Sequence, residues 1–285
     1  KNLQIGYIKN FFSEKRTMQF FTFTIFTKNY NVIFFRGTDI SLLGWEENFN
    51  MILEDRIPSQ VAAKKYVKEI SQLNTRPIII AGHSKGGNLA YYSYFNSNQN
   101  VKDRIIAVYN FDGPSFFKDN YDYSEFNKKL FKFVPNDDVV GIIFERSNRY
   151  IPISTKKKGL NAHDLLTRNF SKESQYKELE RKKNLTLTSK TFQITLNIWL
   201  NKLTKIEIKE LIDFIRGIAT CNQMKDLFAL KLDIIKERKV YLDNIANYDQ
   251  DTKERLKQIS RDLVKTFFSV LLHTKDYKCN GEKVE

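Results

Sequence analysis

The segment "AGHSKGGNLA", residues 81–90, places a serine between two glycines at the spacing Gly-x-Ser-x-Gly. This spacing is typical of a strained strand-to-helix turn that exposes a nucleophilic serine, because side chains at Gly82 and Gly86 would leave the turn no room. The apolar run 78–81 predicts the strand before it, and "NLAYYSYF" predicts the helix after it. We therefore interpret Ser84 as a candidate nucleophile.

The same segment is also rich in glycine next to a lysine, which invites comparison with a phosphate-binding loop. A phosphate loop needs Gly-x-x-x-x-Gly-Lys-Ser/Thr, whereas here Lys85 precedes the glycine pair and no Ser or Thr follows a Gly-Lys step. The glycine spacing also differs from the dinucleotide fingerprint Gly-x-Gly-x-x-Gly. Both nucleotide-binding interpretations are therefore disfavoured.

A serine becomes nucleophilic when a histidine accepts its proton and a carboxylate orients that histidine. The chain has three histidines. His83 adjoins the serine on the turn, where we expect its side chain to point elsewhere, and His273 ends the last helical segment. His163, in "NAHDLL", is therefore the candidate base; its alternatives are a helix cap or a buried structural hydrogen bond.

The candidate acids follow a predicted strand at residues 131–134. Asp137 and Asp138 come directly after this strand, where α/β proteins gather their functional residues. The chain order Ser84, Asp138, His163 is that of α/β-hydrolases. Asp137 remains the alternative acid.

The stretch "FFRGTD" supplies a candidate oxyanion hole. It follows a predicted strand upstream of the serine, and Gly37 would let the backbone approach a substrate. Thr38 is one candidate donor, and the backbone N–H of Lys85 is the second. The alternative is a tight turn capped by Asp39.

The surrounding elements predict an α/β fold. Residues 19–36 predict an antiparallel strand pair, and short apolar runs at 78–81, 105–111 and 131–134 are typical of a buried, mostly parallel sheet flanked by helices. From about residue 185 helical segments follow one another, with capping-box patterns at 204–207 and 251–254. We therefore expect a catalytic domain at residues 1–184, and a helical extension at 185–285 that packs on the core or else contacts a partner or membrane.

Four stretches together, "FFRGTD", "AGHSKGGNLA", "FVPNDDVVG" and "NAHDLL", resemble the class 3 (fungal-type) lipases of the α/β-hydrolase superfamily. More closely, they resemble a bacterial branch of uncharacterised lipase-like proteins, which also shares "GWEE", "PSQ" and "FDGP". The resemblance covers about residues 1–170. It implies an α/β-hydrolase fold, with Ser84 as nucleophile, Asp138 as acid, His163 as base and Thr38 in the oxyanion hole.

The sequence departs from that pattern at three points, one of which is the rival acid Asp137. Gly141 stands where class 3 lipases usually have proline, and Lys85 stands where an apolar residue commonly follows the serine. The Lys85 side chain therefore either favours an anionic substrate group or points away from the substrate. Both alternatives stay open at the level of sequence.

These residues predict a serine hydrolase that cleaves lipid or other acyl esters through an acyl-enzyme, with no cofactor and no metal. The alternative is a catalytically silent protein of the same fold that acts in interactions or at a membrane surface. The net charge of +14 has no long basic run, so we expect no nucleic-acid partner, and only peripheral attraction to anionic membranes.

Two distant cysteines, and no long apolar run, lead us to expect a reducing, cytoplasmic setting. The chain begins at Lys1 rather than at a methionine, so we allow for an N-terminal truncation.

Overall fold

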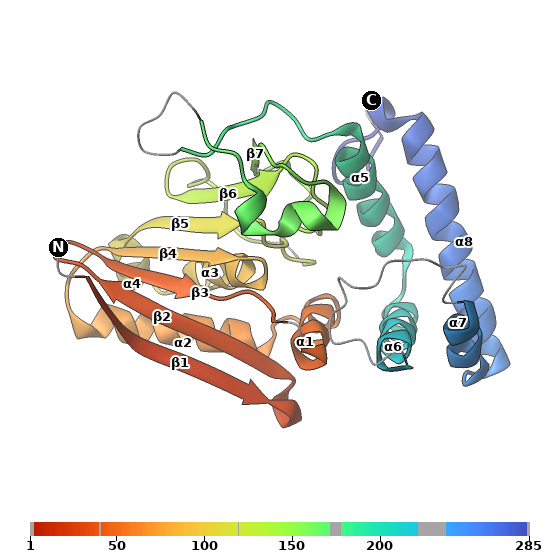
Figure 1. Cartoon of the computed structure of the whole chain (residues 1–285), viewed down its shortest axis with the longest axis horizontal. Helices are drawn as coiled ribbons and strands as arrows, with labels where there is room; N and C mark the ends of the chain where they lie inside the picture. Colours follow the sequence, from red (N-terminus) through yellow and green to blue (C-terminus); the bar gives the residue numbers. More distant parts are fainter. Residues whose placement is uncertain (1–2, 40, 119, 172–177, 222–237, 284–285) are drawn as a thin grey trace.

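The computed structural model describes residues 3–39, 41–118, 120–171, 178–221 and 238–283, and it contains a seven-stranded sheet (Figure 1). The strands lie side by side in chain order: β1 (Gln4–Ser13), β2 (Met18–Phe26), β3 (Asn31–Phe35), β4 (Ile78–His83), β5 (Ile105–Phe111), β6 (Leu130–Pro135) and β7 (Ile151–Ile153). β1, β2 and β3 pair antiparallel, and β3 to β7 pair parallel. The predicted α/β fold with a mostly parallel sheet is confirmed.

Helices cover one face of this sheet (Figure 1). They are α2 (Pro58–Leu73), α3 (Lys85–Phe95) and α4 (Gln99–Arg104). Because side chains alternate along a strand, Ile33 and Phe35 of β3 are buried against these helices, whereas Val32 and Phe34 point to the other face and are only partly buried. The main core therefore lies between the sheet and the helices α2 and α3. Its packing fixes the position of the turn that joins β4 to α3.

The remaining α-helices lie beyond the carboxyl ends of the parallel strands β3 to β7 (Figure 1). They are α1 (Leu42–Leu53), α5 (Leu187–Lys202), α6 (Lys205–Cys221), α7 (Arg238–Ala246) and α8 (Gln250–Leu272). A second apolar cluster joins Trp199 and Ile259 to Phe144 of the loop after β6, and the Trp199 indole N–H donates to the Ile259 carbonyl at 3.0 Å. The predicted C-terminal helices are confirmed, and the domain boundary after residue 184 stays a prediction.

Two helix starts test the capping patterns read from the sequence. At α6, the Thr204 hydroxyl accepts from the Glu207 N–H, and the Glu207 carboxylate accepts from the Thr204 N–H, as predicted. At α8 the predicted cap at Asp251 is wrong. Asp249 precedes the helix in extended conformation and accepts the Thr252 N–H at 2.9 Å, which leaves Asp251 in the first turn.

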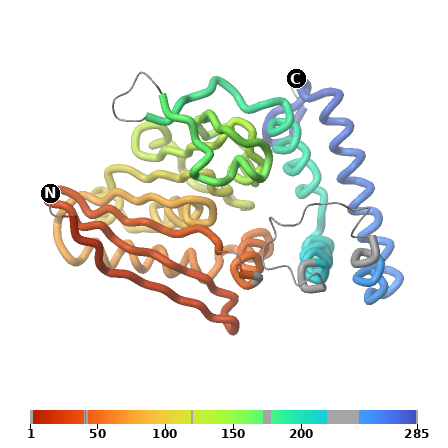
Figure 2. Tube along the Cα trace, viewed as in Figure 1, coloured from red at the N-terminus to blue at the C-terminus, as the bar shows by residue number. Residues whose placement is uncertain are grey.

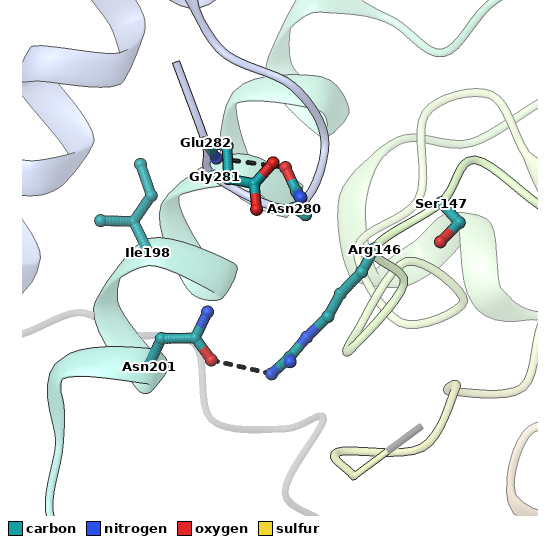
Figure 3. Close-up of a pocket in the computed structure, with 7 residues that line it drawn as sticks. All are labelled: Arg146, Ser147, Ile198, Asn201, Asn280, Gly281 and Glu282. Carbon is teal, nitrogen blue, oxygen red and sulfur yellow. Dashed lines mark hydrogen bonds between the residues drawn. The ribbon is translucent and has the colours of Figure 1, made fainter. Parts of the chain in front are cut away.

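The chain runs from β1, at one edge of the sheet, to α8 on the far side of the molecule (Figure 2). Its C-terminal tail returns to α5, where Asn197 donates to the Cys279 carbonyl at 2.7 Å. Arg146, Asn201 and the tail residues 280–282 border a hollow of about 400 Å³, and Arg146 donates to Asn201 there (Figure 3). Among the described helices, none has the length and apolar character needed to span a bilayer.

Candidate active site

Ser84 occupies the turn between β4 and α3, as the sequence predicts. Its φ of 56° and ψ of −131° lie outside the regions that a serine ordinarily adopts, which is the strain expected of a nucleophile turn. The flanking glycines are required by close backbone approach. A Cβ at Gly82 would lie 2.1 Å from the Gly86 carbonyl oxygen, and a Cβ at Gly86 would lie 2.1 Å from the Phe35 carbonyl oxygen.

The side chain of Lys85 points into the protein core. Its ammonium is 2.9 Å from the Glu47 carboxylate and donates to the Gln19 backbone carbonyl at 2.6 Å, with both charged side chains almost completely buried. Because its ammonium is paired inside the protein, Lys85 does not meet a substrate through its side chain. Lys85 is the first residue of α3, so its backbone N–H has no acceptor within the helix. This N–H, rather than the side chain, is the group of Lys85 that is free of the helix ladder.

The predicted oxyanion loop lies against the Ser84 turn. A Cβ added to Gly37 would come within 2.8 Å of the His83 carbonyl oxygen and 3.0 Å of Ser84 Cβ. The Thr38 hydroxyl accepts from the Asn48 side-chain amide at 2.8 Å, which fixes the loop to α1. Asp39 accepts the Ser41 N–H at 2.9 Å, so the turn-capping role considered for this aspartate is also present.

His163 ends the short helix η2 (Gly159–His163) and is buried. Its Nδ1 lies 2.9 Å from Oδ2 of Asp112, the residue that follows β5. The contact expected between Asp138 and His163 is therefore made by Asp112 instead, because Nδ1 carries at most one proton and Asp112 accepts it. Asp112 also has a positive φ, 58°, so two strained non-glycine residues stand at the ends of the neighbouring strands β4 and β5.

The two candidate acids from the sequence, Asp137 and Asp138, make other hydrogen bonds near the His163–Asp112 contact. Asp138 is fully buried, and its Oδ2 accepts the N–H groups of Val140 at 2.7 Å and of Gly141 at 2.9 Å. The Asp137 carboxylate accepts the hydroxyl of Thr186, the residue that caps α5. Asp137 therefore serves the start of α5, whereas Asp138 borders the His163 site.

Two residues that the sequence did not mark hold the His163 loop in place. Nε2 of His83 is 2.8 Å from the His163 carbonyl oxygen, and the two imidazole rings lie 4.6 Å apart. Arg168 is buried and donates to Asp112 at 3.0 Å and to the His163 carbonyl at 3.3 Å. The His83 ring therefore faces the His163 loop, and the expectation that it does not serve Ser84 stays a prediction.

Burial sets the charges of this cluster. Desolvation lowers the pKa of His163, so the imidazole is neutral near pH 7 and able to accept a proton. The same cause lowers the pKa of His83 to about 3, which keeps that ring neutral. Desolvation raises the pKa of Asp112 to about 7, although the charges of Arg168 and Lys132 oppose the rise.

Potential metal-ligand atoms of His83, Asp112 and His163 lie within 4.8 Å of one another. Two of these residues, however, are hydrogen-bonded to each other through His163 Nδ1 and Asp112. His83 directs Nε2 at a carbonyl, which requires a proton on that nitrogen rather than a free lone pair. The three side chains therefore have the donors and acceptors of a hydrogen-bonded network rather than the free lone pairs of a metal site.

An apolar hollow of about 660 Å³ opens beside the nucleophile turn, on the sheet face opposite α2 and α3. Gly37 and His83 form its inner wall next to Ser84. The rest of the lining is dominated by large apolar side chains (Phe21, Phe23, Phe34, Phe111, Ile153, Leu165, Phe170 and Leu179), and it also includes Arg36 and Arg168. The space next to the serine therefore suits a hydrocarbon group better than a polar one.

A comparison with known proteins assigns the chain to a family. No curated protein and no solved structure gives a significant match. A family model described as Mbeg1-like matches residues 1–216, which include the sheet, the Ser84 turn, Asp112 and His163. The match runs through α5 and into α6, past the boundary predicted after residue 184. The chain belongs to the Mbeg1-like family, a lipase-like family.

Proposed function

We propose that this protein is a serine hydrolase that cleaves carboxylic esters of lipids or other acyl groups. The observation that carries the proposal is the strained Ser84 turn beside a buried, neutral His163 whose Nδ1 is held by Asp112. These are the roles of a nucleophile, a base and an orienting acid. Membership of a lipase-like family supports the same reaction class.

In the proposed reaction His163 accepts the Ser84 hydroxyl proton while Ser84 Oγ bonds to the ester carbonyl carbon. The oxyanion that forms would accept hydrogen bonds from the Lys85 N–H, which opens α3, and from the Thr38 loop, which packs on the turn. His163 then returns its proton to the alcohol that leaves. Water, activated by His163, releases the acyl group from Ser84.

The substrate class follows from the surroundings of the serine. The hollow beside Gly37 is lined mainly by aromatic and aliphatic side chains, which favours an acyl chain over a sugar or a peptide. Lys85 does not select an anionic group, because its ammonium is buried with Glu47. We therefore place the acyl chain in the hollow and the leaving alcohol on the side of His163.

The test is hydrolysis of p-nitrophenyl esters of increasing acyl length by the wild type and by Ser84→Ala. We expect turnover that improves from acetyl to medium-chain esters and is abolished in Ser84→Ala. The oxyanion hole is tested by Thr38→Ala, which should lower kcat with little change in KM. A wild-type protein that turns over no ester of any length would instead favour the silent interaction protein of the same fold.

A further inference from the structure

The buried pair Asp112 and Asp138 has an arrangement that the triad roles alone do not explain. Both carboxyls meet at Gly141, because Asp138 Oδ2 accepts the Gly141 N–H at 2.9 Å and a Cβ on Gly141 would lie 2.2 Å from Asp112 Oδ1. Both aspartates are almost completely inaccessible to solvent. Two ionised carboxylates buried beside the same glycine would repel strongly.

The hydrogen bonds of the pair show where a proton is needed. Asp112 Oδ2 accepts from His163 and Arg168, and Asp138 Oδ2 accepts from two backbone N–H groups. The other oxygen of each carboxyl, Oδ1, is buried and has no donor within the part of the chain that the structure describes. Since a buried polar atom without a partner is costly, one proton between the two carboxyls satisfies both oxygens at once.

We propose that Asp138 retains this proton and donates it to Asp112, so that the pair carries a single negative charge located on the carboxyl that faces His163. Asp138 is thus a positioning residue that acts through Asp112, and Asp112 is the anion that holds the imidazolium during catalysis. The effect of Asp138 on the rate rests on the proposed hydrolase function, whereas the protonation of Asp138 does not.

The electrostatic surroundings favour this division of roles. Arg168 and His163 both contact Asp112, and Lys132 of β6 also acts on it, although the Lys132 ammonium is bonded to Glu145. Desolvation and the neighbouring Asp112 raise the pKa of Asp138 well above its usual value. Asp164 acts on His163 and Arg168 rather than on the pair. His163 and Arg168 act on both carboxyls, and both hydrogen-bond to Asp112, so the negative charge is favoured on Asp112 and the proton on Asp138.

Gly141 is what makes room for the pair. Proline here, as in the class 3 lipases that the sequence resembles, would remove the N–H that Asp138 accepts, and any Cβ would press on Asp112 Oδ1. The glycine therefore accounts for a departure that the sequence alone left without a reason. Gly141→Ala should disturb both carboxyls without touching Ser84 or His163.

The decisive comparison is between asparagine substitutions, because an asparagine has the shape of a protonated aspartic acid and still donates a hydrogen bond. Asp138→Asn should keep kcat/KM within about tenfold of wild type, since one neutral hydrogen bond is retained. Asp112→Asn should lose roughly 10³- to 10⁴-fold, because it stabilises the wrong imidazole tautomer. Asp138→Leu, which cannot donate, should move the acid limb of the pH–rate profile to higher pH, whereas Asp138→Asn should not.

Infrared spectroscopy tests the proton without any turnover. In alkaline buffer, well above the pKa of about 7 of Asp112, the wild type should show the C=O stretch of a buried protonated carboxyl, which Asp138→Asn should lose and the matched control Asp137→Asn should keep. The proposal is overturned if the wild type lacks this band, if Asp138→Asn keeps it, or if Asp138→Asn loses as much activity as Asp112→Asn. If the wild type hydrolyses no ester, the hydrolase assignment fails by itself, and the infrared result still decides the protonation of the pair.

Discussion

His163 and Asp112 come from segments 51 residues apart, yet His163 Nδ1 lies 2.9 Å from Asp112 Oδ2 in a buried site. Their contact fixes the tautomer of the imidazole, because the proton on Nδ1 is used by the carboxylate and Nε2 keeps its lone pair, as the proposed role of base requires. The proposed acid of this site thus follows β5, the strand next to the one that precedes Ser84.

The acid limb of the pH profile should reflect Asp112. Burial lowers the pKa of His163, so the base is already neutral near pH 7, whereas burial raises the pKa of Asp112 to about 7. Asp112 gains a proton below that value and can no longer stabilise the imidazolium. We therefore expect kcat/KM to rise with pH through a midpoint near 7, measured with a soluble short-chain ester.

Arg168 supplies the control for this assignment. Its guanidinium donates to Asp112 and is one of the groups that oppose the rise in the pKa of that carboxyl. Arg168→Met should therefore move the midpoint to higher pH and leave part of the activity recoverable in alkaline buffer. A midpoint that does not change would assign the limb to another group.

Lys85 should matter for stability rather than for substrate choice. Lys85→Met leaves the Glu47 carboxylate buried without its ammonium partner, which typically costs about 3–5 kcal/mol in the free energy of unfolding. Denaturant titration measures the loss, and Lys85→Met/Glu47→Gln should recover part of it because no buried charge is left. Specificity among neutral and anionic esters should stay the same, and a selective loss of anionic esters would show that Lys85 does face the substrate.

The exposed residue Leu166, at the rim of the apolar hollow, should affect the hydrolysis of lipid substrates more than that of soluble ones. Leu165 and Phe170 line the hollow, and Leu166 between them is 88% exposed. Leu166→Ser should lower hydrolysis of esters dispersed in vesicles and leave soluble short-chain esters unaffected. Leu272→Ser is the matched control, because Leu272 is 77% exposed but lies at the end of α8. Equal effects of both substitutions would contradict a role for the rim.

The nucleophile turn could be predicted from sequence because its determinants are local. A strand, a turn with Gly82 and Gly86, and a helix follow one another within one short segment, and the close contacts of Gly82 lie within it, whereas those of Gly86 are with the end of β3. The central strands were predicted for a similar reason, since their apolar runs are buried on the side of α2 and α3. The site residues that the local pattern specifies are therefore Ser84 and its two glycines.

The carboxyl that meets His163 Nδ1 could not be identified from the sequence, because the choice depends on packing between distant segments. Asp112 and Asp138 both follow strands of one sheet, and only the position of the His163 loop decides which of them meets Nδ1. That loop is held by Arg168 and His83, whose contacts no sequence spacing reports. The one available signal was that Asp112 directly follows a strand next to that of Ser84.

Two strands at the edges were also missed, for physical reasons. β1 (Gln4–Ser13) is exposed along most of its length, so it lacks the alternation of buried and exposed residues that identifies a strand. β7 (Ile151–Ile153) is only three residues long and contains Pro152. Edge strands of this kind are defined by their pairing with a neighbour rather than by their own pattern.

The most direct test of the central claim is covalent labelling by a fluorophosphonate, followed by peptide mapping of the adduct. Labelling of the wild type should give one adduct on Ser84, which should be absent in Ser84→Ala and unchanged in Ser41→Ala, whose serine caps α1 nearby. Asp112→Asn should slow labelling strongly, because the reaction depends on the same base. No adduct on the wild type, or an adduct on another serine, would contradict the assignment of Ser84 as the nucleophile.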